Sequence, residues 1–182
     1  GHTWMASMRG DAEQLRRTRA NLVGVASIDV EPWGKGAPAS AVGASTRMTG
    51  KREAFDVVVR NLLVGHRFPG GVLDMQDTWI EVEVADRSGT RIASSGLTHE
   101  KNPDDHDTHV LRSLVVDDKG NVLDEHEMAQ FRATIATQTL APREAQAVRY
   151  SFAVPASAQL PLTVTARPRI AGTPPKWDCQ YR

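Results

Sequence analysis

From residue 53 to residue 166, apolar and polar side chains alternate along short runs, and turn-forming residues separate these runs. A period of two is that of a strand with one face buried and the other in water. No helical pattern intervenes, so two antiparallel sheets are expected to pack face to face. The sequence predicts a mainly β fold, an antiparallel Ig-like β-sandwich of seven to eight strands with an N-terminal α-helix. The expected strands are 55–59, 77–86, 91–95, 110–116, 131–137, 148–154 and 162–166.

The run over residues 77–86 separates its two faces by charge. Its even-numbered positions from 80 to 84 are apolar and are expected in the core, whereas Glu81 and Glu83 are expected in water. The run ends in Arg87-Ser88-Gly89, a three-residue hairpin connection with glycine where a left-handed backbone is needed. Strand 91–95 is therefore expected to pair with it.

A helical period is found over residues 7–29. Asp11 followed by Gln14 fits an N-capping box, so the regular helix is expected to begin there. We interpret Arg16, Arg17 and Arg19 as a solvated face rather than a binding patch. The apolar face of this helix is expected to contain Met8, Ala12, Leu15, Leu22, Val25 and Ala26.

The chain divides into four expected parts: a helical arm over 1–30, a linker over 31–52, the β-sandwich domain over 53–167 and an irregular tail over 168–182. Pro168 is expected to end the last strand, because proline cannot donate to a strand ladder. The chain opens with Gly1-His2 rather than methionine, so we expect a processed or excised segment of a longer protein.

Composition argues against several classes of partner. The 182 residues include 22 Lys and Arg against 22 Asp and Glu, which removes the attraction that phosphate-backbone binding needs, so no nucleic acid is expected. No apolar run has the length of a membrane span. Cys179 is the one cysteine, so the chain forms no internal disulfide and lacks the Cys-x-x-Cys-His motif for covalent haem attachment.

A strand is expected to run into the turn Gly65-His66-Arg67-Phe68-Pro69. A histidine at a strand end is either a ligand to a metal or haem, or a donor to a carbonyl that braces the turn. A single histidine does not decide between these roles. The side-chain amide of Asn61 is expected to cap the same corner.

A second candidate site is the loop over residues 102–109, which precedes a strand. Carboxylate oxygens at close spacing suit calcium, and paired imidazoles suit a transition metal. The spacing matches no EF-hand, and a polar loop without metal is the other interpretation. The candidate ligands are Asp104, Asp105, His106, Asp107 and His109.

No catalytic set is found in the sequence. Glu125-His126-Glu127 lacks the second histidine of a metalloprotease motif, because Gln130 stands in its place. No serine has a nucleophile-elbow context, and no glycine loop opens a helix. We therefore expect a domain that is not an enzyme.

Several ordered motifs resemble those of a known β-domain. They are Asn61 with 65–71, 79–84, Asp86 with Gly89, Ser95-Gly96, His109-Val110, Asp117 with Gly120-Asn121, and 140–144 with 150–155. The segment resembles the non-haem β-sandwich domain at the C-terminal side of multihaem c-type cytochromes of the bacterial periplasm. The chain departs from that pattern at Pro168 and in the residues that follow.

This resemblance implies a periplasmic accessory domain that packs against a haem-bearing module or redox protein, with haem c carried by a neighbouring segment. It places His66 near that haem, and makes His2 an orphaned axial ligand of the missing haem segment. Two other interpretations stay open: an extracytoplasmic Ig-like module that binds carbohydrate or protein, with calcium at 104–107, and a metal-dependent enzyme that uses His106 and His109.

Overall fold

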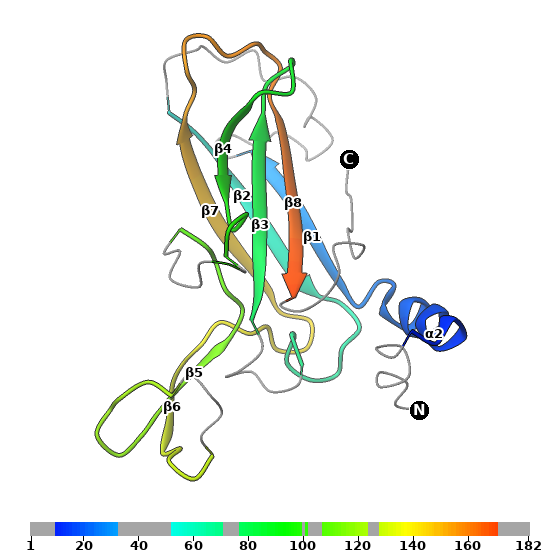
Figure 1. The fold of residues 1–182 in the computed structure, drawn as a ribbon, viewed down its shortest axis with the longest axis vertical. Helices are drawn as coiled ribbons and strands as arrows, with labels where there is room; N and C mark the ends of the chain where they lie inside the picture. Colours follow the sequence, from blue (N-terminus) through cyan, green and yellow to red (C-terminus); the bar gives the residue numbers. More distant parts are fainter. Residues whose placement is uncertain are drawn as a thin grey trace.

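The computed structural model of the chain describes residues 10–32, 52–70, 77–99, 101, 107–123 and 128–170. Over these residues the fold is mainly β, and every strand pair is antiparallel (Figure 1). The elements in chain order are α2(Ala12–Leu22), β1(Ala26–Pro32), β2(Arg52–Asn61), β3(Thr78–Ala85), β4(Arg91–Ser95), β5(Ser113–Val116), β6(Ala133–Thr137), β7(Ala145–Ala153) and β8(Thr163–Ile170). None of the described segments contains a helix with the length and hydrophobicity needed to cross a bilayer.

The strands form three sheets. One has the order β1-β2-β7, the second has the order β4-β3-β8, and β5 pairs with β6 alone. In Figure 1 the β5–β6 pair lies at one end of the molecule, apart from the other six strands. The two three-stranded sheets contribute to one common apolar core.

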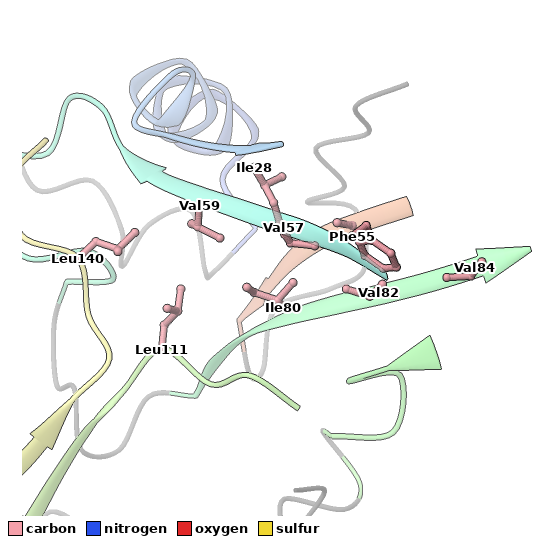
Figure 2. Close-up of a cluster of buried hydrophobic side chains, with 10 residues drawn as sticks. Ile28, Phe55, Val57, Val59, Ile80, Val82, Val84, Leu111 and Leu140 are labelled. Carbon is pink, nitrogen blue, oxygen red and sulfur yellow. The ribbon is translucent and has the colours of Figure 1, made fainter. Parts of the chain in front are cut away.

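The core is made by the alternating positions that the sequence pattern predicts. β2 contributes Phe55, Val57 and Val59, and β3 contributes Ile80 and its even-numbered neighbours 82 and 84 (Figure 2). Burial of each such side chain contributes about 1.5–3 kcal/mol relative to leaving it in water. Leu111 and Leu140, both from outside the named strands, lie at the Val59 end of this cluster and are each at most 2% exposed.

The expected amphipathic run over residues 148–154 is confirmed by β7. Val148, Tyr150 and Phe152 pack against the core, and Val154 is buried just beyond the strand. The Tyr150 ring stacks on Phe55 with centroids 5.6 Å apart. The alternation in this run therefore predicted both its conformation and its buried face.

The N-terminal helix is shorter than predicted. The capping prediction is confirmed, because the Asp11 side chain accepts a hydrogen bond of 2.7 Å from the backbone N–H of Gln14. However, α2 ends at Leu22, and Gly24 follows with a φ of +75°. Residues 26–32, expected to be helix and linker, instead form β1. All of β1 pairs with residues 55–61 of β2.

The C-terminal strand does not end at Pro168. β8 runs to Ile170, and Pro168 lies opposite Ile80 of β3. Proline fits there because β8 is an edge strand of its sheet, so its missing N–H removes no bond from a second neighbour.

Glu81 is not on a wet face. Its side chain is 7% exposed and accepts hydrogen bonds from Arg167 Nη1 at 3.2 Å and Arg169 Nε at 2.9 Å. Both arginines belong to β8, which pairs with β3. The strand is thus covered on both faces, and the buried carboxylate is stable because two guanidinium groups neutralise it.

The hairpin between β3 and β4 is confirmed, with Gly89 at a φ of +83°. Asp86 holds this turn: its Oδ1 accepts from Ser88 N at 2.9 Å and Thr90 N at 3.0 Å, and its Oδ2 accepts from Gln159 N at 3.1 Å. The Ser88 hydroxyl bond, followed by the bond from Gln159 N, lowers the pKa of Asp86 below its ordinary value of 3.8.

A group with a lowered folded pKa stabilises the fold above its unfolded pKa, and this contribution is lost as the pH falls through the folded value. We therefore expect Asp86→Asn to lower the urea midpoint at about pH 6, and the difference from wild type to shrink below about pH 4. Urea unfolding at a series of pH values from about 6 down to about 2 measures both. A difference that stays constant across that range would contradict the role of the charge.

Candidate functional site

The candidate site is the corner that follows β2, which we call the His66 corner and define as residues 61–70. Asn61 is 1% exposed, and its side chain holds the corner together. Nδ2 of Asn61 donates to the carbonyls of His66 at 2.9 Å, Leu140 at 3.3 Å and Ala141 at 3.2 Å. Its Oδ1 accepts from Val64 N at 3.1 Å. The predicted capping role of Asn61 is confirmed.

A second set of bonds anchors the corner to the segment between β6 and β7. Phe68 and Leu140 exchange two backbone hydrogen bonds, each of 2.8 Å. The Arg67 guanidinium donates to the Thr139 carbonyl at 3.0 Å. The turn is therefore held on both sides of His66 by residues about seventy positions away in the chain.

His66 itself is exposed, and its ring is oriented by two contacts. Its Nδ1 lies 2.7 Å from the carbonyl oxygen of Arg67. The ring also packs over Gly70, where an added Cβ would come within 2.5 Å of Cε1. The imidazole therefore occupies space that the Cβ of any other residue at position 70 would fill.

The Nδ1 contact fixes the tautomer of the neutral ring. A carbonyl oxygen only accepts hydrogen bonds, so Nδ1 carries the proton and Nε2 carries the lone pair. No hydrogen bond to Nε2 is made within the described residues. The bracing and ligand roles of His66 thus use different nitrogen atoms and are compatible.

The loop over residues 102–109 is described only at its end. Asp104, Asp105 and His106 lie outside the described residues, as does His2. The carbonyl of Asp107 accepts from the Ser95 hydroxyl at 2.6 Å. His109 is half-buried, and desolvation lowers its pKa, with a hydrogen bond to the Gln146 side chain acting in the opposite direction.

No group of three or more His, Cys, Asp or Glu that could hold a metal is found among the residues that the structure places. The calcium or transition-metal site over 104–109 therefore stays a prediction. Elemental analysis of protein supplemented with calcium or zinc tests it, and protein that remains metal-free would remove it.

One polar cluster was missed by the sequence analysis. His99 is 3% exposed, its ring packs on Trp79 at 4.9 Å, and its Nε2 lies 3.4 Å from Oδ2 of Asp77. Asp77 also lies 3.6 Å from Nη1 of Arg112. Neither ring nitrogen of His99 has a hydrogen-bond partner in the described part of the chain. No local motif could have found this cluster, because its members come from three separate segments.

Comparison with known proteins gives a likeness of fold. No protein-family model matches the chain, and no curated protein matches it. The fold is similar to that of a penta-haem cytochrome c552 from Thermochromatium tepidum, at 16% sequence identity and a TM-score of 0.56. The match covers 89% of this chain and 38% of that one, so this chain spans little more than a third of the cytochrome's length.

Proposed function

We propose that this chain is a non-catalytic accessory domain of a periplasmic multihaem electron-transfer protein. One observation carries the proposal: nearly the whole chain matches a part, and only a part, of a penta-haem cytochrome. A domain that fills 38% of such a protein leaves the larger share of it for the segments that hold haem. This chain has a single cysteine and cannot attach haem c by itself.

In this role the domain packs against a haem-bearing module, excludes water from one side of it and fixes its orientation. Burial of a haem is one of the means by which a protein sets its reduction potential. The β1-β2-β7 and β4-β3-β8 sheets, which share one core, would be the two layers of the expected Ig-like sandwich. A rigid sandwich suits this role because it needs no moving part.

Two linked measurements test the proposal. The first is the sequence of the gene on both sides of this segment, in which we expect Cys-x-x-Cys-His motifs. The second is the haem content of the complete natural protein, from its pyridine haemochrome spectrum. A reading frame without such motifs, together with a natural protein that contains and co-purifies with no haem, would overturn the proposal.

A further inference from the structure

We propose that Nε2 of His99 and Oδ2 of Asp77 are ligands of a divalent transition-metal ion of the zinc class. Asp77 lies directly before β3, and His99 follows β4. Because β3 and β4 are antiparallel, the start of one and the end of the other lie at the same end of their sheet. The inference goes beyond the proposed function, since it involves no haem, and neither residue belongs to the loop over 102–109.

The buried imidazole of His99 lacks the partners that a buried polar group normally has. The residue is 3% exposed, and neither ring nitrogen forms a hydrogen bond in the described part of the chain. Buried polar side chains are nearly always hydrogen-bonded, and an exception commonly marks the place of a bound ion or water molecule. Nε2, the nitrogen that faces Asp77, is therefore available to a group that the protein does not itself supply.

The distance between the two side chains suits a shared ion better than a direct bond. Nε2 of His99 lies 3.4 Å from Oδ2 of Asp77. A charged imidazole that only neutralised a carboxylate would form a hydrogen bond of about 2.7–2.9 Å. Zinc lies about 2.0–2.2 Å from nitrogen and oxygen ligands, so two ligands at a tetrahedral angle are about 3.3–3.5 Å apart. The two atoms already have the separation that one ion requires.

The chemistry of the pair selects the kind of metal. Imidazole nitrogen suits zinc and its neighbours, whereas calcium takes oxygen ligands. The other carboxylate oxygen of Asp77 lies 3.6 Å from Nη1 of Arg112, and a partner of this kind orients a ligating carboxylate. No third His, Cys, Asp or Glu joins the pair among the residues that the structure places, so water completes the coordination. The Asp77 side chain is 24% exposed, which gives an ion access to the site.

The imidazole is held in place by the indole of Trp79. The centroids of the two rings are 4.9 Å apart. The indole is fixed in turn, because its N–H donates to the Gly96 carbonyl at 2.9 Å. A ligand whose side chain is already confined loses little conformational entropy when it binds. Packing against Trp79 thus prepares His99 for an ion that enters from the side of Asp77.

The test uses the whole chain, freed of metal with a chelator, and zinc chloride as the probe. Titration calorimetry is done at about pH 7.5, where an ordinary imidazole is largely neutral. We expect saturable binding of one zinc ion per chain. A long-range ¹H–¹⁵N spectrum of the histidine side chains should show the Nε2 resonance of His99 moving to the range of metal-bound imidazole, while its Nδ1 keeps the proton.

Two variants remove one ligand atom each. Asp77→Asn keeps the shape of the side chain, and His99→Phe keeps an aromatic ring against Trp79. Loss of a residue that only orients a ligand weakens metal binding about 10–100-fold, so each of these variants should weaken zinc binding at least about 10-fold. Asp118→Asn, which changes an exposed carboxylate, and His106→Gln, which changes the predicted loop site, are the controls and should bind zinc as the wild type does.

The urea midpoints of the zinc-free variants show whether they are folded, and Asp77→Asn decides the matter alone if His99→Phe is not. The proposal would be overturned by a wild-type protein without saturable zinc binding, or by an Asp77→Asn variant that binds zinc as tightly as wild type. Loss of binding in His106→Gln alone would place the ion in the loop over 102–109 instead. None of these results changes the accessory role, which depends on haem in the complete natural protein.

Discussion

Asn61→Ala is expected to lower the free energy of unfolding by about 3 kcal/mol, because a buried polar group left without its partner costs about 1–3 kcal/mol. The amide of Asn61 serves three carbonyls and the N–H of Val64, all inside or beside the His66 corner. Alanine removes every one of these bonds and leaves a small cavity. Urea unfolding with linear extrapolation gives the change.

Two further variants identify the cause. Asn61→Asp has nearly the same shape and keeps the acceptor for Val64 N, but it cannot donate to the three carbonyls, so it should be destabilised nearly as much as alanine. Asn121→Ala removes an exposed amide that bonds Asp117 and should cost less than about 1 kcal/mol. An Asn61→Asp variant as stable as wild type would show that the carbonyl bonds contribute little.

Gly96→Ala is the second change expected to have a large effect, also about 3 kcal/mol, from a left-handed backbone and a steric overlap together. Gly96 has a φ of +73°, and a Cβ there would lie 2.7 Å from the Ile80 carbonyl oxygen and 2.9 Å from Cδ1 of Trp79. The Gly96 carbonyl accepts the indole N–H of Trp79 at 2.9 Å. The backbone of β3 would have to shift to relieve the overlap.

Gly89→Ala is the matched control for this experiment. Gly89 has a similar φ of +83°, but an added Cβ would meet nothing within 4 Å. The decrease in the free energy of unfolding of Gly89→Ala should therefore reflect only the cost of the left-handed backbone, about 1–2 kcal/mol. If both variants lose the same free energy of unfolding, close packing against Trp79 and Ile80 is not what requires Gly96.

Errors in the strand predictions have identifiable causes. β1 was missed because the helical face was extended through Val25 and Ala26, although Ala26, Ile28 and Val30 alternate with polar residues as in the strand that pairs with β2. β6 was predicted as a strand, and it is one, but Ile135 is 59% exposed because the β5–β6 pair lies outside the shared core. Alternation reports the conformation of a strand, whereas its packing partner is decided elsewhere in the chain.

The site shows the same division. Asn61 and His66 stand in a local turn motif, so the sequence identified both of them. It did not distinguish bracing from ligand binding at His66, because that depends on where the Arg67 carbonyl and Gly70 lie relative to the ring. The surroundings of His99 could not be predicted, because Asp77 and Trp79 contact its ring only in the folded chain. Arg112 joins the same cluster through Asp77.

By itself, the order of residues determined the strands with period-two alternation, the Asp11 cap, the Gly89 hairpin and the corner at Asn61, since each depends on interactions within a few positions. Only the tertiary structure decided which carboxylates are buried, which strands share the core and which nitrogen of His66 is hydrogen-bonded. Those properties arise from contacts between segments that are distant in sequence, such as Glu81 with Arg167 and Arg67 with Thr139. No local pattern specifies such contacts, because their energies depend on burial and on the position of a distant strand.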